Sequence, residues 1–70
     1  MAFTPVRNPD NAEIARIVSA SKSKAARRIY DAKAGVWWYW PAEQATHAEG
    51  AALLEVEYNT PPGLGDIVTL

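Results

Sequence analysis

The pattern of apolar and polar residues divides the chain into short segments. Five large apolar residues run from Val36 to Trp40 and end at Pro41, which predicts a strand rich in aromatic side chains. Within residues 52–58, apolar residues alternate with glutamates, which predicts a second strand with one buried face. A last short strand is expected over residues 67–70.

Residues 22–34 have the pattern of a helix. Ala25, Ala26, Ile29 and Tyr30 form an apolar stripe, a serine at 21 or 23 would cap its start, and Gly35 would end it. The opposite face would then be basic, with Lys22, Lys24, Arg27, Arg28 and Lys33. A shorter helix is expected over residues 41–48, since Pro41 suits a first helical turn and Gly50 follows as a stop.

Residues 8–20 fit two structures. Asp10, followed by Glu13 three residues later, resembles a helix start, and the apolar residues that follow have helical spacing. The centre of the segment is β-branched, however, and it leads directly into the serine expected to start the next helix. We therefore favour a strand over 13–19, with a helix as the alternative. Residues 1–7 contain Pro5 and are expected to form an edge strand or an arm.

Together these segments predict a single α+β domain over residues 1–70, with one basic helix packed on a three- to four-stranded, mainly antiparallel sheet. The alternative is a helix-turn-helix followed by a β-hairpin wing. The spacing of Ala15, Ser21 and Arg27 resembles that motif, with residues 11–20 and 21–33 as its two helices. Ser19 in place of the usual turn glycine and Arg28 in place of an apolar residue depart from the motif.

The composition narrows the classes of function. The 70 residues include no cysteine and one histidine, His47, so disulfides, thiolate metal sites and multi-histidine centres within one chain are excluded. The serines at 19, 21 and 23 are interpreted as caps and turn residues, and His47 as a surface or interface residue. We expect no enzyme, metal or cofactor. No apolar run is long enough to span a membrane, and a cytoplasmic protein is expected.

Charge is divided unevenly along the chain. Residues 1–35 hold all seven lysines and arginines and three acidic residues, whereas residues 36–70 hold five acidic residues and no lysine or arginine. Such a division bears on the choice of partner rather than on the fold.

The aromatic strand is the candidate binding surface. One of its faces must serve the core, and the other is covered either by residues 41–50 or by a protein partner or sister chain. Exposed tryptophan and tyrosine dominate interface hot spots, which predicts partner-binding residues Trp37, Trp38, Tyr39 and Trp40. In size, lack of cysteine and split charge, the chain resembles the small accessory or inhibitor proteins of phages and mobile elements.

We therefore expect a non-catalytic protein that acts through protein–protein contacts. One alternative is a DNA-binding, regulator-like protein that grips phosphates through Lys22, Lys24, Arg27, Arg28 and Lys33. Another is a structural subunit that forms a homo-oligomer, such as a homodimer, through its C-terminal strand and aromatic face.

Overall fold

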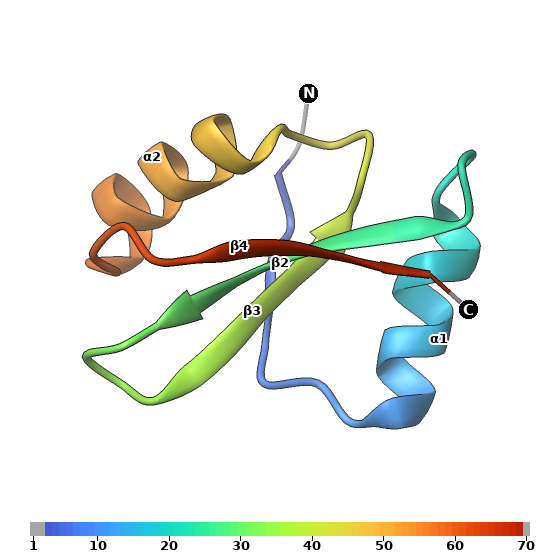
Figure 1. Cartoon of the computed structure of the whole chain (residues 1–70), viewed down its shortest axis with the longest axis horizontal. Coiled ribbons are helices and arrows are strands. Elements are labelled where there is room, and N and C mark those ends of the chain that lie inside the picture. Colours follow the sequence, from blue (N-terminus) through green and yellow to red (C-terminus); the bar gives the residue numbers. More distant parts are fainter. Residues whose placement is uncertain (1–2, 70) are drawn as a thin grey trace.

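A computed structural model describes residues 3–69 and shows four strands and two helices (Figure 1). The elements follow the order β1 (Val6–Arg7), α1 (Asn11–Ala20), β2 (Ala25–Asp31), β3 (Val36–Pro41), α2 (His47–Tyr58) and β4 (Gly65–Thr69). The strands form one antiparallel sheet in the spatial order β1-β3-β2-β4. The predicted α+β class with an antiparallel sheet is thus confirmed.

The two helices cover opposite faces of this sheet. The connection from β1 through α1 to β2 passes over β3, and the connection from β3 through α2 to β4 passes over β2. The two crossovers start from oppositely directed strands and step the same way across the sheet. Crossovers of the same hand must then lie on opposite faces. The sheet is consequently the middle layer of the molecule (Figure 1).

Each face of the sheet has its own apolar core. On the α2 face, Ile29, Trp38 and Trp40 pack with Ala45 and Leu54. On the α1 face, Ala26 and Tyr39 pack with Ile17 and Val18. A strand covered on both faces reads as a continuous apolar run, which explains why β3 shows no alternation of apolar and polar residues.

The segment 8–20 contains a helix, so the strand favoured over 13–19 is wrong. Asp10 caps α1: its carboxylate accepts the Glu13 backbone N–H at 2.9 Å, and the Glu13 carboxylate accepts the Asp10 backbone N–H at 3.3 Å. Ile17 and Val18 then face the sheet. The helical start signals outweigh the β propensity of the segment's centre because the buried helix face supplies the stability.

The basic helix predicted over 22–34 is also wrong. Residues 25–31 form β2, an inner strand of the sheet, with turns on both sides. Lys24, inside the predicted helix, has φ of +55°, a left-handed conformation that an α-helix does not contain. The helix-turn-helix alternative therefore fails as well, because its second helix does not exist.

The strand predicted over 52–58 is wrong, since these residues belong to helix α2. The start of α2 is fixed by Thr46 and Glu49, which exchange side-chain and backbone hydrogen bonds, and its end by Asn59 at φ +53°. The short helix expected over 41–48 is wrong as well: residues 42–44 form a turn, and α2 begins at His47.

Three predictions are confirmed. The aromatic strand is β3, the N-terminal segment contributes the edge strand β1, and the C-terminal strand is β4, which begins at Gly65. Met1, Ala2 and Leu70, which belonged to the predicted segments 1–7 and 67–70, lie outside the described residues. Within residues 3–69, neither helix is long and apolar enough to cross a membrane.

Candidate partner-binding surface

The aromatic run of β3 is divided between the two cores. Trp40 is completely buried, and its indole N–H donates to the Ala45 carbonyl at 2.9 Å. Trp38 and Tyr39 are also buried, on opposite faces. Three of the four predicted partner-binding residues are therefore mainly core residues: Trp40 has no exposed surface, and Trp38 and Tyr39 are 7% and 6% exposed. The reason is that both faces of β3 are covered within the chain, by α2 over Trp38 and Trp40 and by α1 over Tyr39.

Trp37 is only half-buried and lies within a cluster of accessible side chains. Its ring centre is 5.1 Å from that of Tyr30, the residue directly opposite on β2. The Arg28 guanidinium carbon lies 4.3 Å from the centre of the Trp37 ring. Leu64, whose carbonyl accepts the Tyr30 backbone N–H at 3.1 Å, is 81% exposed. We call these four residues, Arg28, Tyr30, Trp37 and Leu64, the aromatic patch.

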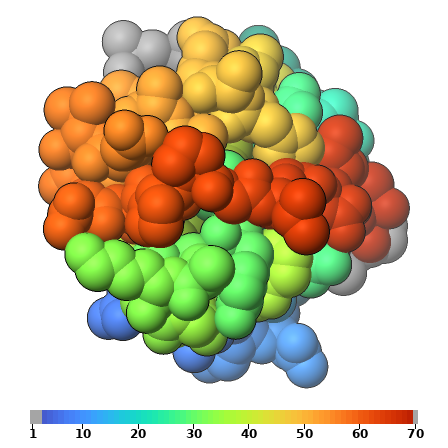
Figure 2. All heavy atoms as spheres, turned by 60° about the vertical axis from the view of Figure 1, so that its left-hand side comes forward, coloured from blue at the N-terminus to red at the C-terminus, as the bar shows by residue number. Residues whose placement is uncertain are grey.

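The aromatic patch occupies the part of the sheet that α1 leaves open. α1 packs on the half around Ala26 and Tyr39, whereas the patch lies toward the β2–β3 hairpin. In Figure 2, the green hairpin segment borders the red-orange residues that lead into β4. The patch thus combines residues of β2 and β3 with Leu64, which directly precedes β4.

Arg28 is held rigidly in the patch. Its two terminal nitrogens donate to the Tyr39 hydroxyl at 3.2 Å and to the Asp66 carboxylate at 3.0 Å. These bonds, the one to Tyr39 first, raise the pKa of Arg28 above its ordinary value. The Arg28 Nε is buried and has no hydrogen-bond partner. The cation therefore stays in place over Trp37 without needing a ligand to order it.

The predicted nucleic-acid-binding residues do not share one surface. Lys22 and Lys24 lie in the turn before β2, Lys33 lies in the β2–β3 hairpin, and Arg27 and Arg28 point to opposite faces of the sheet. Arg27 is directed toward α2, where its Nε donates to the Ala42 carbonyl at 3.1 Å. The continuous basic face that motivated this prediction is absent among residues 3–69.

Ser21, Ser23 and Glu43 form a hydrogen-bonded cluster, which we call the clamp. The Glu43 carboxylate accepts hydrogen bonds from the Ser21 and Ser23 hydroxyls, at 2.7 and 2.6 Å, and from the Ser23 backbone N–H at 2.9 Å. The Ser23 hydroxyl, followed by that of Ser21, lowers the pKa of Glu43 to about 2. Ser21 ends α1 and Ser23 lies in the following turn, so the interpretation as cap and turn residues fits these two, whereas Ser19 lies inside α1. The helix that the serines were expected to start does not exist.

His47 links α2 to the sheet. Its Nε2 lies 2.7 Å from the Asp66 carbonyl oxygen, so Nε2 must carry the proton. Its Nδ1 is then the acceptor for the Arg27 guanidinium at 3.4 Å. Within residues 3–69 no group of three or more metal-ligating side chains occurs. His47 thus has a structural task at the helix start.

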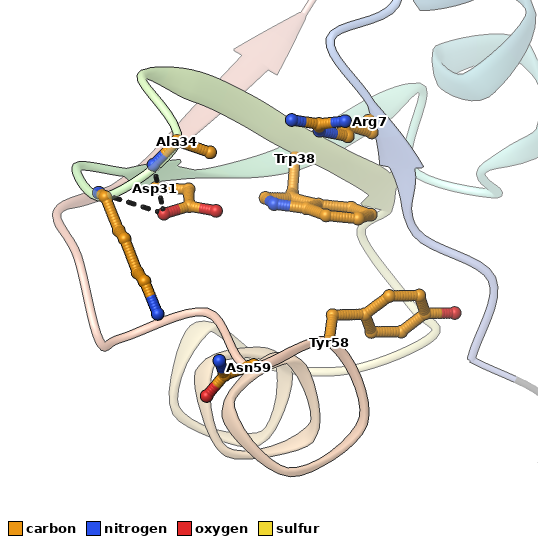
Figure 3. Close-up of a pocket in the computed structure, with 7 residues that line it drawn as sticks. Arg7, Asp31, Ala34, Trp38, Tyr58 and Asn59 are labelled. Carbon is orange, nitrogen blue, oxygen red and sulfur yellow. Dashed lines mark hydrogen bonds between the residues drawn. The ribbon is translucent and has the colours of Figure 1, made fainter.

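A hollow of about 460 Å³ lies between the β2–β3 hairpin and the end of α2 (Figure 3). Burial alone would raise the pKa of Asp31 in its wall, but hydrogen bonds from the Ala34 N–H, the Thr60 hydroxyl and the Lys33 N–H hold that pKa below its ordinary value. The Asp31 oxygens are already used by the Lys33 and Ala34 N–H groups, at 3.1 Å each, and by the Thr60 hydroxyl at 3.3 Å. This carboxylate stabilises the hairpin turn.

Comparison with protein-family models, curated proteins and solved structures finds no match for this chain. The surface itself is therefore the basis for assigning a function. Sequence reasoning identified Trp37 and Arg28 in separate hypotheses, and the pairing of β2 with β3 brings them together. Tyr30 and Leu64 were missed, because Tyr30 was assigned to the apolar stripe of a helix and Leu64 lay outside every predicted helix and strand.

Proposed function

We propose that this protein is a non-catalytic binding protein whose aromatic patch anchors a protein partner. The observation that carries the proposal is Arg28 stacked on Trp37 beside Tyr30. Tryptophan, tyrosine and arginine are the three residue types most enriched in interface hot spots. The fourth member, Leu64, is paired with Tyr30 through its backbone and has an exposed apolar side chain.

The order already present in the patch favours affinity. Arg28 is fixed by Asp66 and Tyr39, so binding does not have to restrain a free arginine side chain. Ordering such a side chain typically costs about 0.5–1.5 kcal/mol. The Tyr30 and Trp37 rings contact each other, with 5.1 Å between their centres. An accessory or inhibitor role, of the kind found in phages and mobile elements, agrees with the small size and split charge, and the lack of cysteine agrees with a cytoplasmic setting.

The proposal is tested by capturing a partner protein from the native host, purifying it and measuring its affinity for variants of this protein. Leu64→Ala and Tyr30→Ala should each weaken its affinity by roughly tenfold, the effect of losing about 1.4 kcal/mol at a hot spot. The matched control is Val56→Ala, which truncates an 84% exposed side chain on α2, away from the patch. If Val56→Ala weakens binding as much as the patch variants, or if none of them weakens it, the patch is not the anchor.

The nucleic-acid alternative has less support. Its basic residues are dispersed, and the one arginine in the patch is paired with Asp66. Aromatic rings on a sheet can nevertheless stack on unpaired bases. A gel shift with single-stranded and duplex DNA at low salt checks this alternative, and absence of a shift for both eliminates it.

A further inference from the structure

β4 is an outer strand of the sheet, and one of its edges is unpaired among residues 3–69. The Tyr30 N–H donates to the Leu64 carbonyl, so along the β2–β4 ladder the hydrogen-bonded pairs include Arg28 with Asp66. Ile67 and Arg27 therefore form a non-hydrogen-bonded pair, in which the Ile67 N–H points away from β2. Four of the five residues of β4 are exposed, and Ile67 is 51% exposed.

The Asp66 carboxylate occupies this free edge. One of its oxygens accepts the Ile67 backbone N–H at 2.8 Å, and the other accepts the Arg28 guanidinium at 3.0 Å. Arg28 is held in turn by the Tyr39 hydroxyl. The carboxylate thus sits where the carbonyl of a further strand would have to bind, and it brings a charge to that position. Charged side chains on edge strands are a known means of preventing strand addition.

We propose that β4 is an edge to which a second copy of the chain can add, and that Asp66 keeps this edge closed. In an antiparallel pair centred on Ile67, that residue would face its own copy through two N–H to carbonyl bonds. Asp66 would then face Val68 of the second copy, and Gly65 would face Thr69. No two like charges are directly opposite, and a net charge of −1 per chain gives little long-range repulsion.

The opposite edge of the sheet is less suited to such pairing. β1 has two residues and lies between Pro5 and Pro9, which lack the N–H that a ladder needs. The backbone carbonyl of Asp66 accepts a hydrogen bond from His47 on the α2 side of the sheet. This bond does not involve the Asp66 carboxylate. Removing that carboxylate therefore opens the edge without detaching α2.

Sedimentation velocity on Asp66→Ala tests the proposal. Wild type should remain monomeric at about 100 μM, and the variant should dimerise with a dissociation constant lower by roughly tenfold or more, because the Ile67 N–H has lost its partner and the edge its charge. Glu57→Ala, which removes an exposed carboxylate of α2, has the same change in net charge and should stay like wild type.

A double variant tests whether the dimer forms through the free edge of β4. Ile67→Pro removes the outward N–H, and proline is tolerated on an edge strand at such a position. Asp66→Ala with Ile67→Pro should therefore return to monomer. Asp66→Asn is the second variant if Asp66→Ala does not fold, as judged by circular dichroism, and it should dimerise more weakly because its amide oxygen can still accept from Ile67.

Three results would overturn the proposal. One is a folded Asp66→Ala or Asp66→Asn protein that remains monomeric at millimolar concentration. Another is equal dimerisation with and without Ile67→Pro, which would place the contact elsewhere. The third is a foreign chain bound to the Asp66→Ala protein in place of a second copy, as read by mass spectrometry. Binding of a partner at the aromatic patch is measured separately and does not decide among these.

Discussion

The guanidinium carbon of Arg28, a residue of β2, lies 4.3 Å from the centre of the Trp37 ring. The same guanidinium donates hydrogen bonds to Tyr39 on β3 and to Asp66 on β4. Through Tyr39 it reaches the centre of β3, and through Asp66 it reaches the edge strand β4. A single side chain of β2 therefore connects three strands on the face that α1 covers only partly. The same arrangement gives the aromatic patch its rigidity and holds the carboxylate that closes the β4 edge.

Arg28→Lys should separate the positive charge from the geometry of this contact. Lysine keeps the charge but lacks the planar fork that bonds Tyr39 and Asp66 together and stacks on Trp37. We expect the folded protein to lose about 1 kcal/mol of stability in urea denaturation. Arg7→Lys, at an exposed position of β1, is the matched control and should change stability by less than about 0.5 kcal/mol. Equal effects of the two substitutions would contradict the assigned role.

Residues 52–58 of helix α2 were predicted as a strand, although the sequence also contained a signal for a helix. The alternation of apolar residues and glutamates over 52–58 favours a strand, but these residues continue a helix whose start signal lies earlier. Thr46 followed by Glu49 is the pattern of a capping box, and it was available in the sequence. The alternation arose because the last turns of α2 extend into solvent, where Val56 is left 84% exposed.

Strand β2 could not be recognised in the same way. Its residues alternate between two covered faces, so Ala25 and Ala26 are both buried and the two-residue period disappears. Alanine and arginine also favour helices, and only tertiary pairing with β3 and β4 overrides that preference. The candidate site depends on this strand, because the register that sets Tyr30 opposite Trp37 exists only in the folded sheet.

Thr46→Ala tests the capping box of α2. The Thr46 hydroxyl accepts the Glu49 N–H at 3.2 Å, and alanine leaves that N–H without its partner. A loss of about 1 kcal/mol in the free energy of unfolding is expected. Thr69→Ala, at an exposed position of β4, serves as the control in the same denaturation series. A loss no larger for Thr46→Ala than for the control would show that the cap does not stabilise α2.

Glu43 should make stability depend on pH in acid. Its pKa falls from the ordinary 4.5 to about 2 in the folded protein, chiefly because of the hydroxyls of Ser23 and Ser21. A lowered folded-state pKa means that the stabilisation is fully present above pH 4.5 and is lost as the pH falls toward 2. Lowered pKa values at Asp31 and Asp66 act in the same direction.

Glu43→Gln isolates the contribution of this residue. The variant should be less stable than wild type at neutral pH, and the difference should shrink between pH 4.5 and about 2. Urea denaturation at a series of pH values measures it, with Glu55→Gln as a control of equal charge change. A difference between wild type and Glu43→Gln that stays constant across this range would mean that the clamp does not depend on the ionised carboxylate.

Gly50→Ala should destabilise the protein even though it places alanine inside a helix. In an ordinary helix interior, this substitution gains about 1 kcal/mol. At Gly50, however, the added Cβ would lie 2.6 Å from Cη2 of Trp40. Trp40 cannot withdraw, because it is fully buried, bonded to the Ala45 carbonyl and packed edge-on against Phe3 at 5.3 Å between ring centres.

We therefore expect Gly50→Ala to lower the free energy of unfolding by about 1–3 kcal/mol, the usual cost of overpacking a core. Trp40→Phe removes the atoms that the new Cβ would meet, so the double variant should be more stable than the two single losses predict together. Ala52→Gly, on the exposed side of the same helix, gives the size of the propensity effect alone. If Gly50→Ala stabilises the protein, α2 and β3 are not packed as closely as the contact between Gly50 and Trp40 requires.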